Sequence, residues 1–442
     1  MAFQGGATVP TERYTNSVAE KFPTVNRTYQ LESSINGRYK RDILPINSSL
    51  NTGGVESNYL EYVVGTNSEE FLDLDEITLQ LSLKFKKDGQ DITPADNFMP
   101  IDSLGFRVLS SLTAHINGVC IENNQFWGLC QTVECYTSMP KSSLPTIGRN
   151  MFLQDLDAAI PETINATSFG GGSLTRTTSA MKTEAEGLIN MCIPIKLNIS
   201  SANFYLLSGC TMRLRFDLAI ANLLINSHEG EFTYAIETAK LWVTKIIPDT
   251  SALLSLNRSL TDGASAISYV HDRTVVKNFI FPAGHQNITM ENCFLSVIPS
   301  FLHMIILKQN ALNGTVTCNA GHFANIGLTN VRLEVNGNNY FSLSSSFPRN
   351  VANAFDSTLK NLKSDDNLLT LQSYRNGRTI YSFDLRSSNT TDVLNIDKSG
   401  NLRLSLQTDD PLTENYSILL IATTSGLLEI FGNRVCKTSF LI

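Results

Sequence analysis

Two runs of alternating apolar and polar residues, each meeting an Asn-Gly pair, lie 219 positions apart in this chain. The first, Leu112–Glu122, contains Asn117-Gly118, and the second, Thr329–Phe341, contains Asn336-Gly337. Alternation with period two places the apolar side chains on one face of a β-strand. Asn-Gly tolerates the two positive φ angles of a type I′ turn, so each run predicts a β-hairpin. Two such hairpins in comparable places indicate two copies of one structural unit.

A second pair of similar runs supports this duplication. Gly209–Phe216 resembles Gly400–Leu406, with an offset of 190 between matching positions. The second unit is therefore 29 residues shorter between the two landmarks, a difference that one surface loop can absorb. The Ser/Thr-rich stretch Leu156–Gly187, which includes Gly170-Gly171-Gly172, is the expected place for the extra residues. It lacks the Gly-Lys-Ser/Thr of a phosphate-binding loop, so we interpret it as a flexible surface loop.

The rest of the pattern predicts short strands separated by Asn, Gly and Pro, with helices confined to the connections. Strands are expected at 59–64, 77–85, 106–122, 189–198, 212–218, 232–247, 275–281, 301–307, 379–385, 401–406 and 416–430, and helices at 125–138, 248–260 and 348–362. This order favours β-sandwiches over an α/β fold. A chain of 442 residues fits two such domains. We predict an extended N-terminal arm at 1–55, a first unit at 56–250, a second unit at 251–436 and a C-terminal tail at 437–442.

Composition and charge narrow the possible partners. Charged residues are only 17% of the chain and the net charge is −7, with no sustained basic run, so sequence-specific nucleic acid binding is not expected. The densest positive patch, Arg38–Arg41, is interpreted as a solvated part of the arm. The first residues lack the basic and apolar regions of a secretory signal. The most apolar run, Phe294–Leu307, is broken by Pro299 and His303 and is too short to span a bilayer.

No catalytic, cofactor-binding or metal-binding residue is predicted, and the protein is not expected to be an enzyme. The eight cysteines show no C-x-x-C, and we expect buried free thiols, including Cys130 and Cys135 on one helix. The six histidines are scattered, and the strand residues His115 and His303 are interpreted as packed side chains. The acidic group Glu69, Glu70, Asp73 and Asp75 is interpreted as a solvated loop and not as the carboxylate pair of a glycosidase. Trp127 and Trp242 are interpreted as core anchors.

Several short segments, in a fixed order, resemble one known family. They are Phe71–Leu74, Ser111–Gly118, Glu134-Cys135-Tyr136, Phe281–Gly284, Glu291-Asn292, Ile298-Pro299, Asn310–Gly314, Arg375–Leu385, Tyr416–Leu420 and Gly432-Asn433-Arg434. Between residues 58 and 435 the chain is similar to the hexon-like major capsid proteins of Polinton/Maverick elements and adintoviruses. The arm and Leu156–Gly187 depart from the family pattern.

The resemblance implies an all-β double jelly-roll: two tandem eight-stranded sandwiches with short helices in the connections. It also implies a homotrimeric, pseudo-hexagonal capsomer that tiles an icosahedral DNA-virus-like shell. The partners would be neighbouring capsomers and a penton-like minor capsid protein, and the location would be the virion. Three alternatives stay open: a vertex (penton-like) capsid protein, a glycan- or receptor-binding β-sandwich, and a hydrolase on a jelly-roll scaffold.

Overall fold

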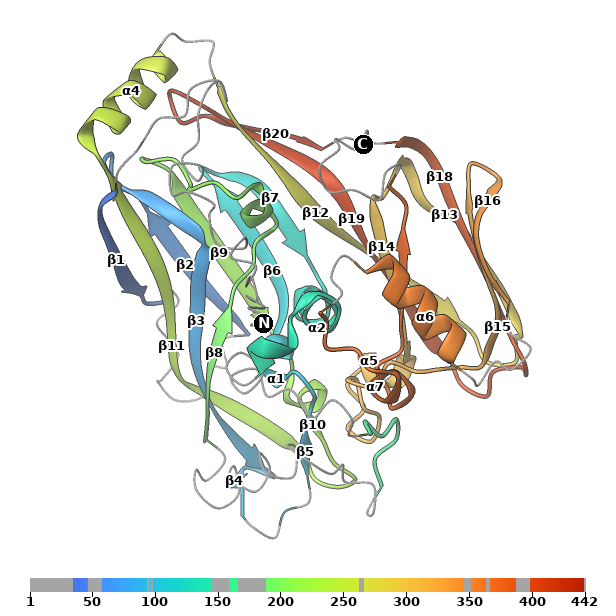
Figure 1. The fold of residues 1–442 in the computed structure, drawn as a ribbon. Helices are drawn as coiled ribbons and strands as arrows, with labels where there is room; N and C mark the ends of the chain where they lie inside the picture. The colour runs from blue at the N-terminus through green and yellow to red at the C-terminus, as the bar shows by residue number, and fades with distance from the viewer. Residues whose placement is uncertain are drawn as a thin grey trace, which may run out of the picture.

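Two β-sandwiches lie side by side in the computed structural model of this chain (Figure 1). The structure describes residues 35–46, 58–93, 96, 98–144, 159–165, 188–261, 266–344, 351–362, 366–386 and 398–440. The predicted all-β class and the two-unit organisation are confirmed within these residues.

The first sandwich consists of two antiparallel sheets. One sheet has the order β1–β11–β3, with β8 and β4 both paired to β3, and the other has the order β2–β9–β6–β7. Their bounds are β1 (Ile35–Ile43), β2 (Tyr59–Gly65), β3 (Phe71–Lys87), β4 (Gln90–Asp91), β6 (Leu109–Ile116), β7 (Val119–Asn124), β8 (Leu188–Pro194), β9 (Thr211–Leu218) and β11 (Phe232–Pro248). A separate two-stranded pair joins β5 (Met99–Pro100) to β10 (Ile225–Asn226).

The second sandwich repeats this plan. One sheet has the order β12–β19–β14–β17, with β20 paired to β19, and the other has the order β13–β18–β15–β16. Their bounds are β12 (Ala266–Phe281), β13 (Asn287–Ile298), β14 (Phe301–Lys308), β15 (Leu328–Val335), β16 (Asn338–Ser344), β17 (Ile380–Asp384), β18 (Lys398–Thr408), β19 (Tyr416–Phe431) and β20 (Cys436–Phe440). When the eight principal strands of each sandwich are counted in chain order, both have sheets of order 1-8-3-6 and 2-7-4-5.

The two Asn-Gly hairpins make the same contact in each sandwich. Asn117 and Asn336 have φ angles of 47° and 53°, and the glycines after them have φ angles of 83° and 78°, as type I′ turns require. The Oδ1 atom of Asn117 accepts a hydrogen bond from the Thr211 N–H at 2.7 Å, and that of Asn336 accepts one from the Asn401 N–H at 2.9 Å. Thr211 and Asn401 are 190 positions apart, the offset between the second pair of similar runs. The predicted duplication is therefore confirmed.

Short helices occupy the connections, as predicted. They are α1 (Leu104–Arg107), α2 (Trp127–Ser138), α4 (Thr250–Thr261), α5 (Gln309–Leu312), α6 (Ala352–Asn361) and α7 (Leu371–Arg375), with a 3₁₀ turn η5 at Asn198–Ala202. The connection after the first hairpin contains α2 and runs from 125 to 187, whereas that after the second contains α6 and runs from 345 to 379. The first is 28 residues longer (63 − 35), close to the predicted 29. Most of Leu156–Gly187 lies outside the described residues.

Two edge strands correct the predicted domain limits. The segment assigned to the arm contains β1, which pairs with β11 from Ile35 opposite Pro248 to Ile43 opposite Leu241. The segment assigned to the tail contributes most of β20, which pairs with β19. Polar residues fill β1 because a strand at the edge of a sheet is partly open to solvent, so the apolar alternation that marks a central strand is missing. Residues 1–34 and 47–55 of the predicted arm lie outside the described residues.

Strand β14 is buried on both faces of its sheet. Every residue of β14 is buried. Leu302, Met304 and Ile306 pack in the core of the second sandwich, whereas Ile305 and Leu307 pack in a core that continues into the first sandwich. Burial on both faces explains why the β14 part of the run Phe294–Leu307 is apolar without alternation.

Candidate functional site

Two members of the acidic group before and within β3, Glu70 and Asp73, form ion pairs, which corrects their interpretation as part of a solvated loop, whereas Glu69 and Asp75 are exposed. The Glu70 carboxylate lies 2.7 Å from Nζ of the buried Lys245 and accepts a hydrogen bond from the Tyr39 hydroxyl at 2.6 Å. Burial would raise the pKa of Glu70, but these hydrogen bonds outweigh it and hold the pKa below its ordinary value. Asp73 is buried within β3, 3.6 Å from the Arg38 guanidinium. A carboxylate held ionised as Glu70 is would be a poor proton donor for glycoside cleavage.

The remaining predicted side chains are structural. The buried His303 shares a 2.8 Å hydrogen bond with Ser382 Oγ, and His115 is half-buried in β6. Trp127 is fully buried, as predicted, but the interpretation of Trp242 is wrong. Trp242 is half-buried on the outer face of β11 and donates from Nε1 to Gln80 at 3.0 Å.

The described cysteines are all free thiols. Five of the eight are buried, including Cys130 and Cys135, whereas Cys120 and Cys192 are exposed and Cys318 is intermediate. Burial raises the pKa of both Cys130 and Cys135 to about 12, so these thiols stay protonated and unreactive at neutral pH. No group of three metal-ligating side chains occurs among the described residues.

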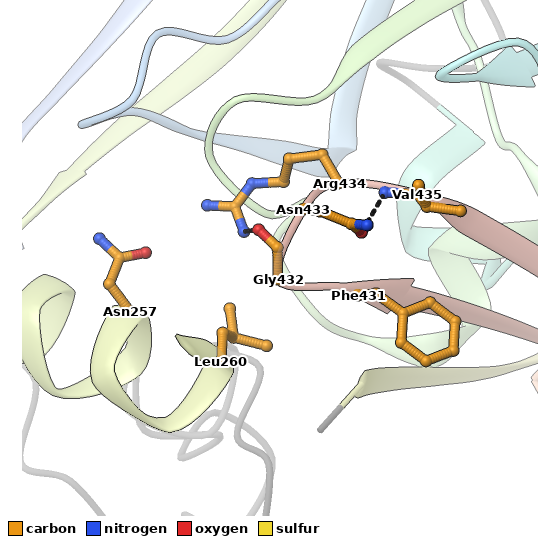
Figure 2. Close-up of a pocket in the computed structure, with 7 residues that line it drawn as sticks. All are labelled: Asn257, Leu260, Phe431, Gly432, Asn433, Arg434 and Val435. Carbon is orange, nitrogen blue, oxygen red and sulfur yellow. Dashed lines mark hydrogen bonds between the residues drawn. The ribbon is translucent and has the colours of Figure 1, made fainter. Parts of the chain in front are cut away.

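A cavity of about 560 Å³ lies between α4 and the turn that joins β19 to β20 (Figure 2). Its lining consists of Asn257, Leu260, Phe431, Gly432, Asn433, Arg434 and Val435. The Arg434 guanidinium is held by the backbone, through Nε to the Ser208 carbonyl at 2.7 Å and NH1 to the Gly432 carbonyl at 3.3 Å. Among the described residues, the lining contains no carboxylate, thiol or imidazole, so these residues offer neither a nucleophile nor a general base.

A buried charged cluster joins the two sandwiches. Nε of Arg378, in the second sandwich, lies 3.5 Å from Oδ2 of Asp102 in the first. The Arg378 guanidinium also stands 5.2 Å from the centroid of the Tyr136 ring, and the Tyr136 hydroxyl donates to Asp102. Burial lowers the pKa of the nearby Arg107 to about 10, and the Asp102 charge opposes this shift. One carboxylate therefore faces two buried guanidinium groups.

Two further sets of hydrogen bonds cross the junction. The hydroxyl of the fully buried Tyr269, in β12, donates to the Tyr205 carbonyl at 3.0 Å and accepts from the Leu207 N–H at 3.1 Å. The Asn117 side chain, at the tip of the first hairpin, donates to the Arg434 carbonyl at 2.8 Å. The first sandwich thus holds both the first strand and the last turn of the second.

A short segment of the first unit also crosses to the second sandwich. Within residues 159–165, the Ile160 N–H donates to the Asn376 carbonyl at 2.9 Å and the Ile164 N–H donates to the Thr317 carbonyl at 2.7 Å. Both isoleucines are buried. Together with the shared core, these contacts bury part of the junction, and a pocket of about 290 Å³ remains between β7, Asn198 and the Arg273–Val276 part of β12.

Large apolar side chains are exposed at the two outer edges of the molecule. Tyr39, Leu44, Ile46 and Val63 are exposed along β1, the segment after it and β2, and Tyr340 is exposed on β16. Figure 1 shows β1 and β2 at one side of the molecule and β16 at the opposite side. Large apolar side chains are also exposed elsewhere, as at Val270 and Ile280 on β12 and Leu295 on β13, so exposure alone does not set these two edges apart.

Comparison with known proteins identifies the fold. No protein-family model and no curated protein matches this chain. Among solved structures, it is similar to a chain of the Sputnik virophage with a TM-score of 0.62 and 12% identity, covering 100% of this chain and 94% of that one. The Faustovirus major capsid protein matches with a TM-score of 0.60 and 9% identity over 91% of this chain and 92% of that one. The mavirus major capsid protein matches with a TM-score of 0.52 and 9% identity over 100% and 97%.

The chain is a double jelly-roll. Each match spans both sandwiches, and the strand orders 1-8-3-6 and 2-7-4-5 occur in both jelly-rolls. Of the helices that the structure describes, none combines the length and the apolar character that crossing a membrane needs.

The sequence did not predict the residues that join the two jelly-rolls, although a signal for three of them was present. Tyr136, Arg378 and Arg434 each lie in one of the segments that carry the family resemblance. The resemblance therefore extends to the junction, where side chains far apart in the sequence must fit one another.

Proposed function

We propose that this double jelly-roll is the major capsid protein of an icosahedral DNA-virus-like particle and that it assembles as a homotrimer. The observation that carries the proposal is the tandem fold itself. Two jelly-rolls account for the described chain from Ile35 to Phe440, and the Faustovirus and mavirus chains that match it nearly end to end are major capsid proteins. The mavirus match also agrees with the resemblance to the Polinton/Maverick group.

The duplication gives a physical reason for a trimer. Three chains with two similar jelly-rolls each place six sandwiches around one axis, so a three-fold assembly can occupy a six-fold position in a shell. The two exposed apolar edges differ from one another, which suits a heterologous, head-to-tail contact. Such a contact closes into a ring when the rotation between subunits divides a full turn.

The proposed action is assembly and not a reaction. Among the groups considered for chemistry, Glu70 and Asp73 are ion-paired, five of the eight cysteines are buried free thiols, and His303 is packed in β14. The partners would be further capsomers and a penton-like minor capsid protein, in the virion. A vertex protein built from one jelly-roll does not account for the second sandwich.

The mass of the purified protein tests the proposal. We expect multi-angle light scattering at micromolar concentration to give three times the chain mass of 48.7 kDa. Negative-stain images of the same sample should show particles with a pseudo-hexagonal outline. A monomer or dimer at that concentration would contradict the proposal and would favour the glycan- or receptor-binding alternative.

A further inference from the structure

The pocket of about 290 Å³ lies where β7 of the first jelly-roll packs against β12 of the second (Figure 1). Ligand pockets in proteins usually measure about 300–1,000 Å³, so this one suits a small molecule. We propose that it binds a small zwitterion, with Glu122 holding the ammonium group of the ligand and Arg273 holding its carboxylate. This site is separate from the proposed capsomer and does not depend on it.

Glu122 of β7 supplies a buried carboxylate to the pocket. Its side chain lines the pocket although the residue is only 4% exposed. Oε2 accepts a hydrogen bond from the Asn198 N–H at 2.7 Å, whereas Oε1 accepts none from the residues that the structure describes. A buried carboxylate is costly unless its oxygens find donors or a countercharge. Oε1 is therefore the atom left to accept a hydrogen bond from a ligand.

No cation of the described chain neutralises Glu122. Burial raises the pKa of Glu122 to about 8, and only the hydrogen bond from the Asn198 N–H opposes this shift. The Cys130 thiol of α2, whose pKa the Glu122 charge helps to raise, is itself buried and protonated. An ammonium group bound at Oε1 would supply the missing countercharge and would favour the ionised carboxylate.

Arg273 of β12 supplies the opposite charge on the other wall of the pocket. Its side chain is half-buried, and burial lowers the pKa of its guanidinium below the ordinary value. An anionic group in the pocket would offset this cost. The walls also carry apolar side chains from both jelly-rolls, which can pack against the methylene groups of a ligand: Ile121, Phe126, Val275 and Val276.

The two charges disfavour simpler ligands. A molecule with only an ammonium group would engage Glu122 and leave Arg273 unpaired, and a molecule with only a carboxylate would do the reverse. A metal ion lacks ligands, because no group of three His, Cys, Asp or Glu side chains occurs in the described part of the chain. Since the two walls belong to different jelly-rolls, a bound zwitterion would link them and stabilise the folded chain.

Isothermal titration calorimetry of the full-length protein tests the site. The probes are glycine, β-alanine, γ-aminobutyrate and ε-aminocaproate, which separate the two charges by increasing lengths, with butylamine and butyrate as probes of a single charge. We expect one of the amino acids to bind about tenfold or more tightly than either single-charge probe. Near pH 7, binding should also release about one proton, measured in buffers of different ionisation enthalpy, because the ammonium group ionises Glu122.

Matched variants locate the binding. E122Q removes the carboxylate and keeps its volume, and it should lose about tenfold or more in affinity together with the proton release. E237Q removes an exposed carboxylate from β11, in the other sheet of the first jelly-roll, and should bind as the natural sequence does. R273Q should bind the amino acid no better than butylamine.

Three results would each overturn the proposal. They are the absence of binding by every amino acid at millimolar concentration, equally tight binding of butylamine or butyrate, and unchanged affinity in an E122Q protein whose circular dichroism matches that of the natural sequence. If E122Q does not fold, the comparison of probes and the proton release in the natural sequence decide the question. A trimer found by light scattering has no bearing on these outcomes, so the site and the proposed capsomer can fail separately.

Discussion

Replacing Asp102 by Asn should measurably loosen the junction between the jelly-rolls. Asp102 and Arg378 have 2% and 0% of their side chains exposed, and Asp102 also opposes the buried charge of Arg107. The amide has almost the volume of the carboxylate, so the substitution removes the countercharge while leaving both guanidinium groups in place. Removing one partner of a buried ion pair typically costs about 3–5 kcal/mol.

That cost converts into a modest shift of melting temperature because the chain is long. At about 2.1 cal/mol/K per residue, a chain of 442 residues has an unfolding entropy of about 0.9 kcal/mol/K. We therefore expect D102N to lower Tm by about 3–5 °C, followed by circular dichroism at one protein concentration, since Tm of an oligomer depends on concentration. One transition is expected because the hydrophobic core continues across both jelly-rolls.

The matched control is D356N. Asp356 forms an i,i+4 ion pair with Lys360 on α6, but both side chains are more than 60% exposed. An exposed pair of this kind contributes about 0.5 kcal/mol or less, so Tm should change by less than about 1 °C. If D102N lowers Tm no more than D356N does, the reasoning about the buried cluster is wrong.

Two further predictions concern Glu122 and the N-terminal arm. Burial raises the pKa of Glu122 to about 8, although the hydrogen bond from the Asn198 N–H opposes this shift. Between about pH 4.5 and 8, the folded chain therefore keeps a proton on Glu122 that the unfolded chain has released. The free energy of unfolding falls as the pH rises through that window, by up to about 1.4 kcal/mol per pH unit. In E122Q the fall should be absent, and parallel Tm–pH curves for both proteins would refute this. Deleting residues 1–34 should spare the trimer and weaken the contacts between capsomers. Deleting residues 1–50 should also abolish the trimer because it removes β1. Light scattering measures the trimer and shell assembly measures the contacts between capsomers, and a trimer that survives the longer deletion would show that β1 is not needed for it.

The sequence predicted the parts of the fold that have local signals. The Asn-Gly turns need only two residues with positive φ, and the strands around them need only alternation, so both hairpins were predicted correctly. Helix α2 was predicted from apolar positions at helical spacing, and α6 from its place after the second hairpin, which matches the place of α2 after the first. The edge strands β1 and β20 were missed because polar residues are tolerated at a sheet edge and leave no apolar pattern.

The junction could not be predicted residue by residue, because its partners are far apart in the chain. Asp102 and Arg378 meet only after both jelly-rolls have folded, and neither is distinctive in its local sequence. Trp242 was misplaced for a related reason: alternation predicts that a strand has two faces but not which one the core covers. The acidic group near β3 likewise looked solvated because its cations, Arg38 and Lys245, come from two other strands.

The two jelly-rolls differ on the outward face of their third strands, β3 and β14, because the first jelly-roll covers this face only in the second. On the outward face of β14, Ile305 and Leu307 pack in the core that continues into the first jelly-roll. On the corresponding face of β3, Gln80 accepts a hydrogen bond from Trp242, and Ser82 is hydrogen-bonded to Asn190. An apolar face there would be exposed in every newly folded chain and would promote aggregation. In the proposed capsomer, a polar face would let a single chain fold without exposing an apolar surface, so we expect the contact between copies to be more polar than the contact between the jelly-rolls of one chain.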